Sequence, residues 1–237
     1  MIAGWQLHDS LSAEQETPTM MTLYGVYRSR ALRPLWLLAE ADVPFTHVPV
    51  IQAYRLTDPT AVGAPLNTAT PDFLSVNPIG QIPALRDGPL LLTESLAICL
   101  HIARKHGSKL GPASDDEASL MENWALFAAT SIEGAAIEIL YTYRDKQQDT
   151  PTGQGILKIA AQKLSRPLAR LESHLNGRDW LLDRFTVADI IVEECLRYGQ
   201  PYAPLLADFP NVSRWLLACQ ARPAFQKVWA ARNAEPE

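Results

Sequence analysis

A short loop near the start of the chain carries hydroxyl side chains that could stabilise an anion. Residues 25–33 read GVYRSRALR and offer Tyr27 and Ser29, with Tyr24 just before them and no cysteine. Ser29 falls where a helix is expected to begin, and the N–H groups and dipole of a helix N-terminus favour negative charge. The pattern indicates either an anion site with a hydroxyl donor or a simple N-cap formed by Ser29.

A second candidate anion site follows a predicted hairpin. Glu94 and Ser95 stand where a helix begins, so Ser95 can donate to a carboxylate through its hydroxyl and backbone N–H, and Glu94 can pair with an ammonium group. The structural alternative is a plain helix cap made by Thr93 or Ser95. A dozen residues upstream, the Ile82-Pro83 step is a position where proline can hold an unusual backbone turn.

Alternating signals place these residues in a small mixed α/β domain. A short strand is expected over residues 22–25, a helix from about residues 30–33 to 41, and a strand over 45–51, where Pro49 suggests a sheet edge. Residues 52–70 form a long connection without a clear period, and such connections are usually functional or mobile. Two further strands are expected on either side of the turn signal Asp87-Gly88, over residues 82–86 and 89–92, before a helix over 94–106.

After this region the strand signals stop. The remaining segments read as helices, over residues 115–144, 156–175, 186–198, 211–221 and 223–231. The predicted division is therefore an N-terminal extension over residues 1–20, a mixed domain over 21–106, a linker over 107–114 and an all-helical domain over 115–237.

One helix start in the second half has the spacing of a capping box. Thr186 stands at the N-cap position and Asp189 at the third helical position, with Phe185 and Ile190 placed as a hydrophobic staple. We expect this feature to nucleate a core helix and assign it no part in catalysis.

Three of these segments, in this order, match the glutathione transferase family. They are residues 77–83 (NPIGQIP), 93–98 (TESLAI) and 185–190 (FTVADI), and the likeness extends over about residues 21–230. The chain resembles a cytosolic, bacterial-like, serine-type member. The resemblance implies a thioredoxin-like α/β domain followed by an all-α domain, glutathione as co-substrate and a symmetric homodimer.

The resemblance also implies roles for the residues around the two turns. A cis peptide bond is expected at Pro83, with the backbone of Ile82 pairing with the cysteinyl backbone of glutathione. Glu94 and Ser95 would bind the γ-glutamyl group, and Gln81 would add a contact to the peptide.

Thiol activation is expected in the loop after the first strand, because the thiolate and not the thiol attacks. A hydrogen-bond donor beside the sulfur lowers the pKa of the thiol by favouring its charged form. Ser29 is preferred because it lies four residues before Arg33, similar to the spacing in serine-type members, while Tyr27 and Tyr24 stay open as alternatives. The loop has no cysteine, which argues against a thiol transferase that works through a mixed disulfide.

The electrophile pocket is expected between the domains, where small-molecule sites are common. Trp124 and Tyr141 are candidates on the helical side, together with Phe127 and Tyr143, and core packing is the alternative for Trp124 and Phe127. On the other side, Tyr54 and Arg55 in the long connection are candidates for a lid.

Composition restricts the partners and the compartment. The net charge of −5 argues against nucleic acid and anionic membranes as partners, because both reward clustered basic residues. The arginines of the loop (Arg28, Arg30 and Arg33) either neutralise the carboxylates of glutathione or form a solvated face. No signal peptide is expected, so the predicted compartment is the cytoplasm. The cysteines, at 99, 195 and 219, lack metal-site spacing, and no metal is expected.

The predicted function is a transferase that activates the glutathione thiolate for attack on a small hydrophobic electrophile, as in detoxification. One alternative is a non-catalytic binding or regulatory protein on the same fold, and another is a glutathione-dependent isomerase or dehalogenase.

Overall fold

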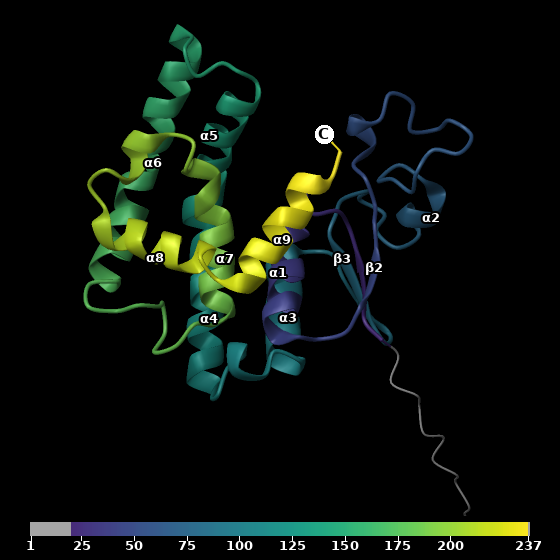
Figure 1. Cartoon of the computed structure of the whole chain (residues 1–237), viewed down its shortest axis with the longest axis horizontal. Coiled ribbons are helices and arrows are strands. Elements are labelled where there is room, and N and C mark those ends of the chain that lie inside the picture. Colours follow the sequence, from purple (N-terminus) through teal and green to yellow (C-terminus); the bar gives the residue numbers. More distant parts are fainter. Residues whose placement is uncertain (1–19, 237) are drawn as a thin grey trace, which may run out of the picture.

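The computed structural model describes residues 20–236. The predicted N-terminal extension lies outside the described residues except for Met20. A small sheet with its helices occupies one side of the molecule in Figure 1, and a larger group of helices occupies the other side.

The N-terminal domain is built on a four-stranded sheet. Its strands are β1 (Thr22–Tyr24), β2 (Thr46–Val48), β3 (Ala84–Asp87) and β4 (Leu90–Leu92). They lie in the order β2-β1-β3-β4, with β1 parallel to β2 and the other neighbours antiparallel. The predicted edge strand is therefore confirmed as β2, and β3 and β4 form the predicted hairpin.

Helices complete this domain. They are α1 (Leu32–Ala41), α2 (Pro71–Leu74) and α3 (Ser95–Lys105), together with a short 3-10 helix, η1 (Ala53–Arg55), in the long connection. Neither α2 nor η1 was predicted from the sequence, because each is about one turn long and has no period to recognise.

The C-terminal part of the described chain is helical. Its helices are α4 (Asp115–Phe127), α5 (Gly134–Arg144), α6 (Pro151–His174), α7 (Val187–Leu196), α8 (Pro210–Gln220) and α9 (Pro223–Ala234), with short 3-10 turns at η2 (Ser108–Leu110), η4 (Arg197–Gly199) and η5 (Ala203–Leu206). The predicted helix over residues 115–144 is continuous, but its centre, η3 (Ala128–Glu133), is a π-helix. Such segments are rare and often lie at functional sites.

One hydrophobic core joins the two domains. Trp36 of α1 is completely buried, and its ring contacts Phe185 before α7 and Phe225 of α9, with ring centroids 6.0 and 5.0 Å away. Figure 1 shows α9 lying beside α1, so the last helix returns to the N-terminal domain. The pairing fixes the loop before α1 relative to the end of α9.

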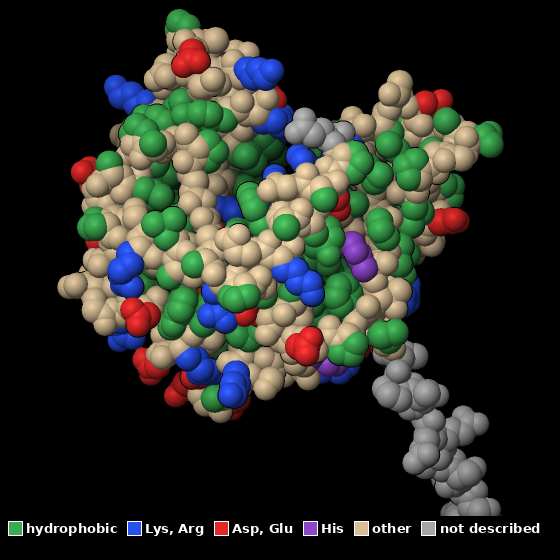
Figure 2. Space-filling view, in the orientation of Figure 1, with side chains coloured by type: hydrophobic (Ala, Val, Ile, Leu, Met, Phe, Trp, Pro, Cys, Tyr) green, Lys and Arg blue, Asp and Glu red, His purple; other side chains and the backbone are tan. Residues whose placement is uncertain are grey.

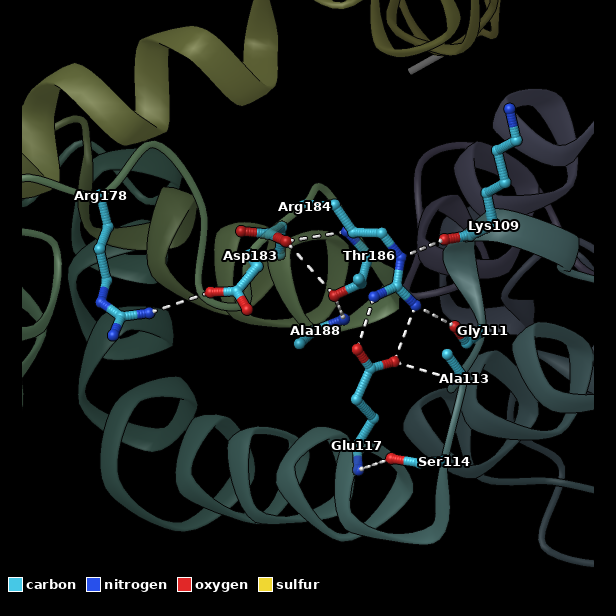
Figure 3. Close-up of polar contacts among 11 residues, drawn as sticks. Lys109, Gly111, Ala113, Ser114, Glu117, Arg178, Asp183, Arg184, Thr186 and Ala188 are labelled. Carbon is cyan, nitrogen blue, oxygen red and sulfur yellow. Dashed lines mark hydrogen bonds and ion pairs between the residues drawn. The ribbon is translucent and has the colours of Figure 1, made fainter.

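The predicted linker is fastened by one arginine of the helical domain. Arg184 donates to the carbonyl oxygens of Lys109 (3.0 Å) and Gly111 (2.8 Å) and forms a two-pronged ion pair with Glu117 of α4 (2.6 and 2.8 Å). Figure 3 shows the guanidinium reaching all three partners at once. The connection between the domains is therefore held at its carbonyl groups.

The continuous helix from Asp115 to Arg144 is long and apolar enough, by length and composition, to cross a membrane. Its best window has a mean hydropathy of 1.2, and 39% of that window is buried inside the protein. It packs against α6 and α7 within the helical domain. Apolar residues such as Met121 and Ile132 are buried there, whereas Leu120 and Leu126 are exposed.

Candidate functional site

Strand pairing brings the loop before α1 beside the proline turn. Tyr24 at the end of β1 is paired with Ala84 at the start of β3, so Gly25 lies next to Pro83. The Ile82–Pro83 peptide bond is cis, as the family resemblance implied. Gly25 has φ +146, and a Cβ atom there would lie 2.7 Å from the Cβ of Ala31, so only glycine lets the loop approach this closely.

The loop itself is organised by Ser29. Its Oγ donates to the carbonyl of Val26 (2.7 Å) and accepts from the backbone N–H of Ala31 (3.0 Å). These are the cap-type contacts of the structural alternative, although α1 itself begins three residues later, at Leu32. Ser29 is half-buried, and a ligand would have to replace Val26 as the acceptor of its proton.

The two candidate tyrosines lie in different elements and contact different rings. Tyr24 lies in β1, and its ring faces Phe73 with centroids 6.3 Å apart. Tyr27 lies in the loop with its ring edge-on to His47, at 5.5 Å. Burial and then the nearby Glu235 carboxylate raise the pKa of Tyr27, so its phenol stays protonated and able to donate.

The start of α3 is open. Glu94 is its N-cap residue, is exposed, and makes no side-chain cap hydrogen bond; no other side chain among residues 20–236 caps this end. Ser95 is only 5% exposed, and its Oγ accepts a hydrogen bond from Arg33 Nη1 (2.9 Å). Because arginine only donates, the hydroxyl proton of Ser95 is left for another acceptor.

Arg33 connects this helix start to the second domain. It is 1% exposed and donates from Nη2 to Glu133 at the end of the π-helix (2.9 Å), and Arg30 donates to the same carboxylate. Burial would raise the pKa of Glu133, but the charge and hydrogen bonds of Arg33 and Arg30 outweigh it and lower the pKa. Glu133 is therefore ionised and balances a buried guanidinium.

The three loop arginines thus have three different environments. Arg33 is buried at the domain interface, which rules out a solvated face for it. Arg30 is 46% exposed over Glu133. Arg28 donates from Nε to carbonyl oxygens near the end of α9. The hydrogen bonds from these arginines to the helical domain could not be foreseen from spacing, because each partner there is 100 or more residues away along the chain.

The remaining expected glutathione contacts lie on the proline turn. The carbonyl of Gln81 accepts from Asn77 Nδ2 (2.7 Å), which holds the turn, while the Gln81 side chain is exposed. Pro83 is buried and Ile82 is half-buried. The structure therefore brings Ser29, Tyr27, the 81–83 turn and the start of α3 to one region.

The predicted pocket residues differ in exposure: Tyr141 and Tyr54 are exposed, and Trp124 is buried. Tyr141, near the end of α5, is 40% exposed, and the Arg144 guanidinium lies 4.3 Å from its ring centroid. A hydrogen bond to Asp145 is the main cause that raises the pKa of Arg144, and the phenols of Tyr141 and Tyr54 add to it. Tyr54 lies on η1 in the N-terminal domain and is 81% exposed. Figure 2 shows the surface hollowed between the helical domain and the end of α9.

Trp124 does not join this group. It is 4% exposed, and its ring contacts Phe127 (5.6 Å) and His174 of α6 (4.8 Å). These contacts favour core packing, the alternative given for Trp124, and its place in the electrophile pocket stays a prediction.

Among the described residues, one group could hold a metal ion: Asp87, His101 and His106, with Nε2 atoms 2.7 and 3.1 Å from Asp87 Oδ2. The Lys105 ammonium contacts the same oxygen at 2.8 Å and balances its charge. These four groups fasten the β3–β4 hairpin to the end of α3. The three cysteines are free and buried, and burial raises the pKa of the Cys195 thiol to about 12.

Comparison with known proteins covers both domains. Residues 19–104 match the glutathione S-transferase N-terminal domain, and residues 133–223 match the C-terminal domain. Glutathione S-transferase 3 of Zea mays is 34% identical over 226 residues, which are 91% of this chain and 96% of that protein. Elongation factor 1-gamma 3 of Oryza sativa is 31% identical over 170 residues, 69% of this chain and 40% of that protein.

Solved structures agree with the sequence matches. Glutathione S-transferase I bound with lactoylglutathione is 30% identical, with a TM-score of 0.74 over 90% of this chain and 99% of that one. The two curated relatives above come from plants, as do others that are named as F members, which is the phi type. The expected bacterial-like, serine-type subgroup is therefore wrong, whereas the family and fold are confirmed. The chain belongs to the glutathione S-transferase family.

Proposed function

We propose that this protein binds glutathione and activates its thiol for attack on a small hydrophobic electrophile. The observation that carries the proposal is the close approach of Gly25 to the Ile82–Pro83 turn, together with the uncapped start of α3. The sheet pairing of β3 begins at Ala84, so the backbone of Ile82 lies outside the ladder, where an extended peptide can pair with it. The open helix start adds N–H groups for a carboxylate.

Glutathione would lie along these groups in an extended form. The backbone of Ile82 would pair with the cysteinyl residue, and Gln81 would contact the peptide. Ser95 would donate its free hydroxyl proton to the γ-glutamyl carboxylate, and the exposed Glu94 would pair with the γ-glutamyl ammonium. This arrangement directs the thiol toward the loop that carries Tyr27 and Ser29.

We assign thiol activation to Ser29, with Tyr27 as the alternative. A hydroxyl donor near the sulfur stabilises the thiolate and lowers the pKa of the thiol. Ser29 already donates a hydrogen bond at the loop and needs only to exchange Val26 for the sulfur. Tyr24 is less suited, because it lies within β1 and packs against Phe73.

The test has two stages. Binding to immobilised glutathione and elution by free glutathione comes first, and failure to bind contradicts the proposal. Turnover is then measured against a panel of electrophiles for the Ser29→Ala, Tyr27→Phe and Tyr24→Phe variants. We expect Ser29→Ala to lose about 100-fold in kcat/KM, since removal of one such donor costs two to three decades. A rate within threefold, with a large loss in Tyr27→Phe, would move the assignment to Tyr27.

A non-catalytic binding role is the second candidate. The similarity to an elongation factor subunit supports it, and so does the present engagement of Ser29 with Val26. Glutathione binding without turnover of any electrophile would favour this role. A glutathione-dependent isomerase or dehalogenase is distinguished by including its substrates in the same panel.

We further propose a cytoplasmic homodimer that acts in detoxification. Leu120 and Leu126 on α4 are 49% and 65% exposed, and Leu90 on β4 is 40% exposed, so apolar surface is available on both domains. Sedimentation equilibrium measures the assembly directly. A single species of 26.2 kDa would contradict the dimer.

A further inference from the structure

The segment Arg232–Pro236, which we call the strap, lies against the loop that carries Ser29. The side chain of Glu235 accepts hydrogen bonds from two successive backbone N–H groups: Tyr27 N donates to Oε1 and Arg28 N donates to Oε2, both at 2.8 Å. Successive N–H groups that converge on one anion form a nest, and such nests bind carboxylates and other anions. The loop before α1 is therefore an anion site that holds a carboxylate of the protein's own chain.

Other contacts hold the strap in place. Arg28 Nε donates to the carbonyl oxygens of Arg232 (3.1 Å) and Glu235 (3.2 Å), and Arg55 on η1 donates to the carbonyl of Pro236. Gln52 in turn donates to the carbonyl of Arg28 (3.1 Å). The strap thus bridges the loop and the long connection, at the point where Figure 1 shows the chain leaving α9 toward the N-terminal domain.

The position of the strap conflicts with the bound thiolate. Under the proposed function, on which this inference rests, the glutathione sulfur carries negative charge beside Ser29, one residue from the Glu235 contacts. Two anions in adjacent positions repel each other, and only one can use the N–H groups of Tyr27 and Arg28. Glu235 is half-buried, so water screens that repulsion only in part.

We propose that the strap is a built-in competitor of glutathione, in which the Glu235 carboxylate occupies the anion site and the thiolate must displace it. The measured glutathione affinity is then the intrinsic affinity reduced by the fraction of molecules whose strap has left the loop. A chain that lacks Glu235 and the residues after it leaves the anion site open and binds glutathione more tightly, and a variant that loses only the charge binds it somewhat more tightly.

The experiment compares two variants with the full chain. In one, the chain is shortened to end at Ala234, which removes residues 235–237; in the other, Glu235→Gln keeps the shape but replaces charged acceptors by one neutral acceptor. We expect the glutathione Kd to fall about tenfold in the shortened chain, which has lost the competing carboxylate and its backbone contacts. In Glu235→Gln the Kd should fall only about threefold, because the neutral acceptor still binds the N–H groups, with hydrogen bonds about half as strong as those to an ionised acceptor. Asp208→Asn is the matched control, since it removes one charge from an exposed residue of the helical domain, and its Kd should not change.

Titration calorimetry at pH 7 measures the Kd, and hydrogen exchange without glutathione follows the amides of Tyr27 and Arg28. Both amides should exchange faster in the shortened chain. Equal Kd values in the full and shortened chains contradict competition by the strap and leave the proposed function intact. Absence of binding in every variant overturns the proposed function itself. A large fall in kcat with an unchanged Kd also overturns competition, because Glu235 would then be acting as the acceptor of the thiol proton.

Discussion

Two helix starts in this protein have similar sequence signals and opposite structures. At α7, Thr186 Oγ1 accepts from the N–H of Ala188 (3.3 Å), and Asp189 accepts from the N–H of Thr186 (2.9 Å). At α3, Glu94 and Ser95 leave the first N–H groups uncapped, and the Ser95 oxygen is turned toward Arg33. A helix start closed by its own side chains serves the fold, whereas an open one keeps its N–H groups for a ligand.

Removal of the capping box at α7 should have the largest effect on the free energy of unfolding. Asp189 is fully buried and also accepts from the N–H of Leu181 and from Trp215 Nε1, both at 2.9 Å. Asp189→Ala leaves three buried N–H donors without an acceptor, so we expect a loss of at least about 3 kcal/mol in the free energy of unfolding. Urea denaturation measures it.

The control is Asp183→Ala. Asp183 is 99% exposed and makes a single ion pair of 3.5 Å with Arg178, so its removal should change stability by less than about 0.5 kcal/mol. Similar values for the two variants would show that the capping box adds little and would remove the contrast with α3.

A substitution at the uncapped start of α3 should instead change the affinity for glutathione more than the stability of the fold. Ser95→Ala removes the hydroxyl that we expect to donate to glutathione, and the Kd should rise about 30-fold, which is about 2 kcal/mol. Stability should fall by only about 1 kcal/mol, because Arg33 keeps its ion pair with Glu133. Calorimetry and urea denaturation give the two values.

Ser95→Thr is the matched variant, since it keeps the hydroxyl and should retain most of the affinity. If Ser95→Ala lowers stability by 3 kcal/mol and leaves the Kd unchanged, the two helix starts are alike and the site assignment at α3 is wrong.

The contrast extends along the helices, because every residue of α7 is buried while α3 keeps an exposed face. Glu193 of α7 accepts from Gln220 Nε2 (2.8 Å), and burial together with the Glu194 charge raises the pKa of Glu193 to about 8. Between about pH 4.5 and 8 the unfolded chain has released this proton and the folded chain has not. The stabilisation from Glu193 therefore declines as pH rises, by up to about 1.4 kcal/mol per pH unit.

Glu193→Gln removes the titrating group, so the free energy of unfolding should fall less steeply between pH 5 and 8. Urea denaturation at four pH values measures the slope. Glu122→Gln, at an exposed position of α4, should keep the steeper slope. Equal slopes for all three proteins would show that Glu193 is ionised in the folded state.

Local signals predicted much of this fold. The hairpin at Asp87-Gly88, the capping box at Thr186 and the helical segments were foreseen because each depends on residues close together in the sequence. The cis bond at Pro83 came from the family resemblance. Helix ends differed by a few residues, as for α6, which begins at Pro151 rather than Ile156.

Long-range contacts were not predicted. Spacing could not show that Arg33 is buried against Glu133, one hundred residues away, or that Glu235 reaches the loop before α1. The π-helical centre of the long helix was missed because its apolar pattern barely differs from that of an α-helix. The roles assigned to Ser29 and to the other site residues stay predictions, since they concern ligands rather than the chain itself.

The ion pair between Arg33 and Glu133 also restricts how the two domains can be recombined in evolution or in the laboratory. A chimera that joins this N-terminal domain to another helical domain would inherit a desolvated guanidinium. Removing one partner of such a buried pair costs about 3–5 kcal/mol. A helical domain with a carboxylate at the position of Glu133 would avoid this cost, so that single charge should favour some exchanges of domains over others.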